Sequence, residues 1–194
     1  MTPKPGFAQV QDEVWQRLRA HLGERWDGAR VVVHAGPWMV LLDSFGTESK
    51  RGGYTRLSAP FANPETFRFT IYEEGPFSWL GKLLGMQDIE IGEPPFDEAW
   101  VVQSNSPPKV RTVLGNPQLQ ALLPSLPACE LTLRDAEGDF DHLESSGDQE
   151  DQPPHDELLF SCAGLLDDPA RLERMYQLFA ITLIQLCSLS AAYE

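Results

Sequence analysis

The residues best suited to chemistry are acids gathered around a proline-rich stretch. Five carboxylates lie close together in the chain, at Asp88, Glu90, Glu93, Asp97 and Glu98. Carboxylate oxygens are the ligands that hard divalent cations prefer. This cluster, with Asp88 and Asp97 as the candidate metal ligands, predicts one function: a metal- or small-ligand-dependent enzyme or binder acting through residues 88–98.

The same stretch also has a purely structural interpretation. In GEPPFDEAW, residues 92–100, two prolines fix the backbone and push the residue before each toward extended geometry. Phe96 can bury beside the strand that follows, and Asp97 can accept backbone N–H bonds in the turn. Every residue type is explained in this way, so the pattern favours a corner of the chain over a reactive site.

Other catalytic and ligand-binding signatures are absent from the sequence. The run DAEGDFD, residues 135–141, fails as a calcium loop because its glycine is fourth and position twelve is Ser146. The chain has no GxSxG elbow, and the loop GTESKRGG, residues 46–53, lacks the GxxxxGK[ST] phosphate-binding pattern. We therefore predict no cofactor and favour a protein that is not an enzyme.

Charge and cysteine content limit the partners and the compartment. The formal net charge is -14, and ten of the acids fall in residues 135–157, which contain no Lys or Arg. This balance is the opposite of the basic surface that nucleic acids and anionic lipids select. No apolar stretch is long enough for a membrane span, and the N-terminus has no apolar signal core. Three cysteines lie far apart in apolar runs, at Cys129, Cys162 and Cys187. We expect a cytoplasmic protein with buried, inert thiols.

Two segments are the candidates for a contact surface. Lys50, Arg51 and Arg56 form the compact basic patch of the chain. The apolar segment FSWLGKLLGM, residues 77–86, carries Trp79 and Leu83. Ten residues are short for a membrane-interface helix, so this segment predicts packing over the sheet or against a partner protein.

Hydrophobic periodicity predicts an α+β fold in one domain, residues 1–194. We expect a mainly antiparallel sheet with an N-terminal amphipathic helix at 8–23, short inserted helices, and a long apolar C-terminal helix that begins at Asp168-Pro169. The first two strands should form a hairpin at Gly36-Pro37. Strand-like runs fall at residues 29–36, 38–45, 54–61, 66–74, 88–92, 99–105, 129–135 and 156–166. Helical segments fall at 77–86 and 108–123, and the second is broken into two short helices at Gly115-Asn116-Pro117.

Two finer expectations follow from composition and alternation. Phe67, Phe69 and Ile71 alternate with Arg68, Thr70 and Tyr72, which predicts one buried and one wetter face of the sheet. The acidic insertion at about 144–156 has too few apolar residues to offset its ordering entropy, so we expect it to be mobile.

Residues 88–123 also carry a recurring pattern. An "I-x-x-G…FD…F-x-V" strand is followed by a short helix with a basic residue and leucines. The pattern falls on Ile89, Gly92, Phe96, Asp97, Trp100, Val102, Arg111, Leu114 and Leu119. It resembles a loosely defined set of uncharacterised bacterial proteins, with the likeness strongest over 54–123. The resemblance implies a recurring fold module and brings no catalytic residue with it.

Together these observations favour a small protein-binding or scaffold module, with a chaperone-like role included. The partner is another protein, or a second copy of the chain that contacts the apolar C-terminal helix. Trp79, Leu83, Lys50, Arg51 and Arg56 are the predicted contact residues. The alternative is the metal- or small-ligand-dependent protein that uses Asp88 and Asp97.

Overall fold

The computed structural model describes residues 30–35, 38–46, 53–73, 87–126, 128–135, 156–164 and 168–192, and the structural statements below concern these residues. The helix predicted at 8–23, the helix predicted at 77–86 and the acidic insertion at 144–156 lie outside them.

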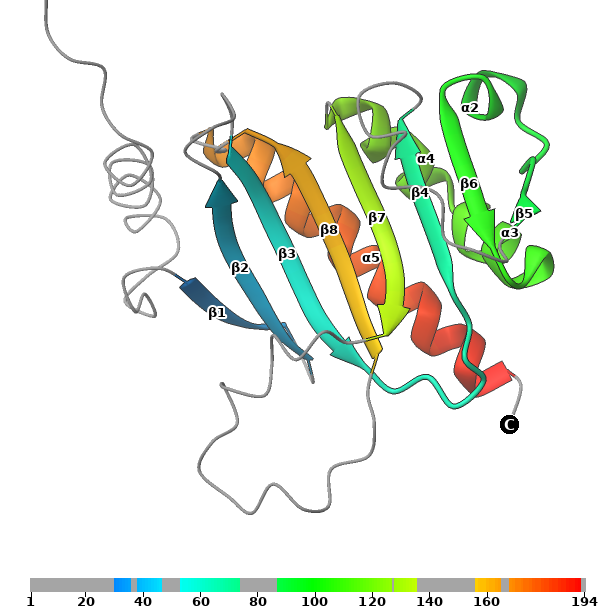
Figure 1. Cartoon of the computed structure of the whole chain (residues 1–194), viewed down its shortest axis with the longest axis horizontal. Helices are drawn as coiled ribbons and strands as arrows, with labels where there is room; N and C mark the ends of the chain where they lie inside the picture. Colours follow the sequence, from blue (N-terminus) through cyan, green and yellow to red (C-terminus); the bar gives the residue numbers. More distant parts are fainter. Residues whose placement is uncertain are drawn as a thin grey trace, which may run out of the picture.

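The described strands form one antiparallel sheet of eight, as the sequence predicted in kind (Figure 1). The order across the sheet is β1-β2-β3-β8-β7-β4-β6-β5. The strands are β1 (Arg30–Ala35), β2 (Trp38–Gly46), β3 (Gly53–Phe61), β4 (Phe69–Glu73), β5 (Gln87–Asp88), β6 (Trp100–Ser104), β7 (Cys129–Asp135) and β8 (Asp156–Ala163). Ala35 pairs with Trp38, which confirms the predicted β1–β2 hairpin.

Helices cover one face of this sheet. The long helix α5 (Pro169–Ala192) runs across the sheet, with α3 (Pro107–Leu114) and α4 (Pro117–Leu122) beside it (Figure 1). A 3-10 turn, η1 (Leu123–Ser125), follows α4, and a single helical turn, α2 (Pro94–Asp97), precedes β6. Within the described residues, no helix combines the length and apolarity that a membrane crossing requires.

Local signals place the helix ends where the sequence predicted them. Asp168 Oδ1 accepts a hydrogen bond from Ala170 N at 3.0 Å, and Pro169 is the first residue of α5. The predicted break at 115–117 separates α3 from α4, where Asn116 Oδ1 accepts from Gln118 N at 2.9 Å.

The core lies between the sheet and α5. Phe69, Phe160 and Phe179 are among its largest fully buried side chains, and the first two come from strands that lie under the helix. Burial of such side chains supplies most of the favourable free energy of folding, at about 25 cal/mol per Å² of apolar area. The sheet and α5 therefore form one hydrophobic unit, which also includes buried side chains of α2 and α3, such as Phe96 and Val113.

The alternation of apolar and polar residues in β4 correctly predicted which side chains lie on the same face of the sheet. It wrongly predicted that the polar face would be exposed. Thr70 and Tyr72 were expected on the wetter face, yet they are only 1% and 6% exposed. Thr132 Oγ1 donates to the Phe69 carbonyl at 3.0 Å and so accepts from Thr70 Oγ1 at 2.8 Å. A period of two shows which side chains share a face, but it does not show whether that face is covered.

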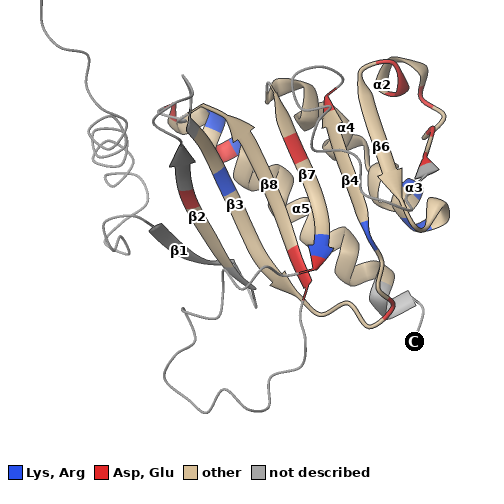
Figure 2. Ribbon diagram, viewed as in Figure 1, with Lys and Arg blue, Asp and Glu red and all other residues tan. Residues whose placement is uncertain are grey.

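The second face of the sheet carries paired charges, whose positions on β2, β3, β7 and β8 can be followed in Figure 2. Arg134 Nη2 lies 3.1 Å from Glu157 Oε2, and the two residues are opposite each other in the β7–β8 register. Burial raises the pKa of Glu130 on the same strand, and the charge of Arg134 opposes that rise. Ion pairs thus compensate charges that the sheet removes from water.

Candidate functional site

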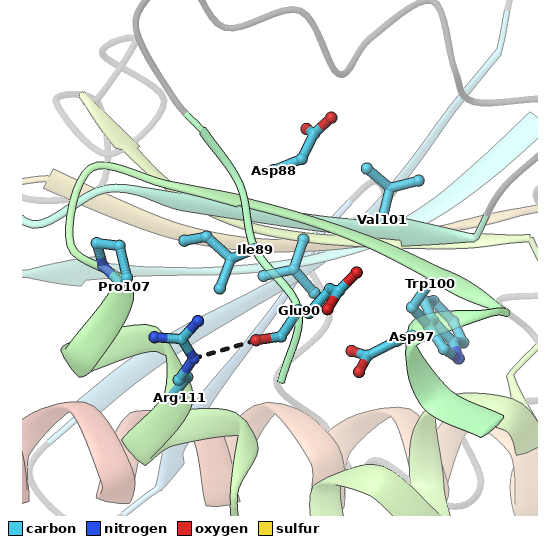
Figure 3. A pocket seen from close by; sticks show the side chains of 9 residues that line it. Asp88, Ile89, Glu90, Asp97, Trp100, Val101, Pro107 and Arg111 are labelled. Carbon is cyan, nitrogen blue, oxygen red and sulfur yellow. Dashed lines mark hydrogen bonds between the residues drawn. The ribbon is translucent and has the colours of Figure 1, made fainter. Parts of the chain in front are cut away.

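A pocket of about 540 Å³ opens at the β5–β6 end of the sheet, beside α2 and α3 (Figure 3). We call it the edge pocket. It is lined by Asp88, Ile89, Glu90, Asp97, Trp100, Val101, Val102, Pro107 and Arg111. The structure therefore brings three of the five predicted carboxylates to one concave surface.

The Asp97 carboxylate is held by the backbone of the turn before α2. Oδ1 accepts from Ile91 N at 2.8 Å and Oδ2 accepts from Gly92 N at 2.9 Å. Gly92 has a φ of 95°, a backbone conformation that side-chain-bearing residues rarely adopt. The turn role predicted for Asp97 is confirmed, and its carboxylate enters the pocket in a fixed orientation.

The proline-rich stretch forms more than a turn. Pro94 and Pro95 begin α2, where a missing N–H costs nothing, and the helical turn directs Phe96 inward. Phe96 stacks on Trp100 with ring centroids 6.1 Å apart, and both rings are buried. The resulting aromatic pair supports the wall of the edge pocket from inside the core.

Replacing Asp97 by alanine should lower the free energy of unfolding by about 1–3 kcal/mol, because two backbone N–H groups lose their acceptor. Urea denaturation followed by circular dichroism measures the change. Glu98→Ala is the matched control, since Glu98 is the next residue in the chain, is exposed and does not line the pocket. Equal stability of the two variants would contradict the turn role of Asp97.

Asp88 and Glu90 lie at the sheet edge, and the Asp88 side chain lies on the opposite side of β6 from Asp97 (Figure 3). Asp88 Oδ1 accepts from Gln103 Nε2 at 2.8 Å, and these residues are partners in the β5–β6 register. The Glu90 side chain is exposed. Over the described ranges, no group of three or more His, Cys, Asp or Glu side chains converges as a metal site would require.

Arg111 was not among the site residues predicted from the sequence. It projects from α3, and its Nε donates to the Glu90 carbonyl at 3.0 Å (Figure 3). This bond ties α3 to the segment after β5 and presents a guanidinium in the same pocket as three carboxylates. The available signal was the short helix at 108–114, in which a basic residue follows the acidic stretch.

The base of the edge pocket is apolar. Ile89, Trp100 and Val102 are all buried members of the hydrophobic core. The pocket lining contains three carboxylates and one guanidinium, so its net charge is negative and favours cations. The arrangement suits a cationic group attached to an apolar or extended body.

Of the contact residues predicted from the sequence, the structure describes Arg56. Lys50, Arg51, Trp79 and Leu83 are outside the described residues. Arg56 lies on β3 and pairs with Asp43 on β2, with Nε to Oδ1 at 2.8 Å and Nη2 to Oδ2 at 2.5 Å. Because Asp43 is buried, this forked pair binds the two strands together.

No protein family, no curated protein and no solved structure matches this chain in sequence or fold. The likeness of residues 88–123 to a set of bacterial proteins stays a resemblance, and the functional argument depends on the edge pocket itself.

Proposed function

We propose that this protein is a binding module that receives a positively charged segment of another protein in the edge pocket. The observation that carries the proposal is the composition of that pocket. Asp88, Glu90 and Asp97 line it together with buried core residues and one guanidinium, that of Arg111. Such a surface attracts a lysine or arginine side chain and excludes acidic segments.

The state of the carboxylates supports binding over catalysis. Both oxygens of Asp97 accept backbone N–H bonds, and Asp88 accepts from Gln103. These bonds hold the carboxylates in a fixed orientation, which suits recognition of a cation. The alternative from the sequence, a metal- or small-ligand-dependent protein using Asp88 and Asp97, would use the same pocket.

The position of the pocket suits an extended partner. β5 is the outermost strand on this side of the described sheet, and only Gln87 and Asp88 belong to it. Edge strands offer unpaired backbone groups to an added strand. A partner segment lying along β5 would bring alternate side chains toward Asp88 and Glu90.

Fluorescence anisotropy with labelled peptides tests this proposal. The probe is an extended peptide of alternating lysine and valine, and its glutamate–valine counterpart is the charge control. We expect binding of the lysine peptide alone, with an affinity that falls as salt rises. Equal binding of both peptides, or of neither, would contradict the proposal.

Charge reversal at the rim tests the location. Glu90→Lys should weaken the lysine peptide at least tenfold, because it replaces an attractive carboxylate with a like charge. Glu98→Lys makes the same change of net charge on an exposed residue outside the pocket lining and should have a much smaller effect. Similar losses in both variants would show that only overall charge matters.

Self-association is a second candidate with one observation in its favour. Ile184 on α5 is 50% exposed, and Ile181 beside it is half-buried. A second copy that packed on this side of α5 would cover both. Light scattering of the wild-type protein and of Ile184→Glu distinguishes a monomer from a dimer that forms through α5. A charge at position 184 would dissociate such a dimer.

A further inference from the structure

Two cysteines that are far apart in the chain lie opposite each other in the sheet. Cys129 on β7 and Cys162 on β8 are direct partners in the antiparallel register, and both side chains are fully buried. Opposite residues of an antiparallel pair project from the same face of the sheet. The two thiols therefore lie side by side between the sheet and α5.

The backbone hydrogen bonds next to Cys129 and Cys162 show which kind of antiparallel residue pair they form. Ala163 N donates to the Ala128 carbonyl at 3.0 Å, and these residues come directly after Cys162 and directly before Cys129. Bonds at those flanking positions identify Cys129–Cys162 as a non-hydrogen-bonded pair. Such pairs have the closer Cα spacing, about 4.5 Å, which is within the range of about 4.4–6.8 Å that a disulfide spans.

We propose that Cys129 and Cys162 are an oxidisable pair that forms a cross-strand disulfide when the protein meets a low-molecular-weight disulfide such as oxidised glutathione. In the first exchange one protein thiolate attacks the glutathione disulfide and releases one glutathione. The second protein thiolate attacks the mixed disulfide and releases the other. The two protein thiols are oxidised to one S–S bond, and one oxidised glutathione is reduced to two thiols.

The surroundings keep the pair reduced until the strand end opens. The hydrogen bond with Cys162, followed by burial, raises the pKa of the Cys129 thiol, so it is protonated near neutral pH. Exchange requires a thiolate that can reach the oxidant. Cys129 is the first residue of β7, and Cys162 is followed by one further residue of β8. Fraying of this end exposes both thiols without unfolding the whole sheet.

The disulfide would close a covalent loop that contains the acid-rich residues 136–155. It joins β7 and β8 at the end opposite Asp135 and Asp156, between which the acidic residues 136–155 run. Closing a loop over residues 129–162 reduces the entropy of the unfolded chain. Oxidation should therefore stabilise the sheet, and reduction should reverse the effect.

Mass spectrometry of the full-length protein tests the pair directly. The protein is incubated with oxidised glutathione under native conditions, denatured, and blocked with N-ethylmaleimide. We expect loss of two hydrogens, one maleimide adduct on Cys187, and a linked peptide pair that contains Cys129 and Cys162. The reaction should accelerate as pH rises, and the oxidised protein should melt at a higher temperature until dithiothreitol is added.

Variants provide matched controls. Cys187→Ser keeps the proposed pair and should form the disulfide at the wild-type rate, whereas Cys162→Ala should not form it. The peptide map of the wild-type protein is decisive even if Cys162→Ala folds poorly. Three maleimide adducts after prolonged oxidation, stable glutathione adducts alone, or a linkage that includes Cys187 would overturn the proposal.

Discussion

The Phe179→Ala variant should lose about 3–5 kcal/mol of free energy of unfolding relative to wild type. Phe179 is fully buried on α5, in the core cluster that the helix forms with the sheet. Truncation removes the apolar surface of the ring and leaves a cavity that its neighbours fill only in part. Urea denaturation followed by circular dichroism gives the change in unfolding free energy.

A second position on α5 is the control. Ile184 is 50% exposed, so Ile184→Ala should change the stability of the monomer by less than about 1 kcal/mol. The contrast isolates burial from helix propensity, because both substitutions place alanine within one helix. Equal losses at low protein concentration would contradict the packing of α5 described above. A loss at Ile184 that appears only at high concentration would indicate self-association.

Signals confined to a few neighbouring residues predicted their elements well. Asp168 and Pro169 mark the start of α5, and the pair Gly36-Pro37 marks the β1–β2 hairpin. The turn role of Asp97 also followed from its neighbours, because its two backbone donors lie five and six residues away. In each case the structure-forming interaction is local, so the sequence contains it directly.

Interactions between segments that are distant in the sequence could not be predicted from local sequence patterns. β8 lies between β3 and β7, and that order brings Cys162 opposite Cys129. Which distant strands become neighbours depends on tertiary packing, and a pattern within one strand does not contain it. The burial of Thr70 was mispredicted because alternation shows which side chains share a face and does not show how far neighbouring side chains cover that face.

In the candidate site, too, residues close together in the sequence were predicted and a residue brought in by tertiary structure was not. Asp88 and Asp97 were recognised because they belong to one dense acidic stretch. Arg111 joins them only because α3 returns to the sheet edge and donates to the Glu90 carbonyl. A basic residue on a short helix is normally a solvated side chain, so the residue type of Arg111 alone favoured no role in binding.

Arg68, which lies just before β4, binds an aspartate at the end of β7 and an aspartate at the start of β8. Its Nη1 and Nη2 bind the two oxygens of Asp156 at 2.6 and 2.8 Å, and Nη2 also binds Asp135. Asp135 and Asp156 are opposite each other at the ends of β7 and β8. Like charges in that position destabilise a sheet, so the guanidinium of Arg68 compensates both.

Replacing Arg68 by alanine should therefore cost about 2–4 kcal/mol of unfolding free energy at neutral pH, since the buried Asp156 loses its counterion. Arg111→Ala is the control: Arg111 is exposed, and the structure gives it one hydrogen bond. Adding Asp156→Asn to Arg68→Ala should recover part of the loss, because the remaining side chain is uncharged. If the double variant is no more stable than Arg68→Ala, the loss arises from packing of the arginine stem, and the charge compensation inferred for Arg68 is wrong.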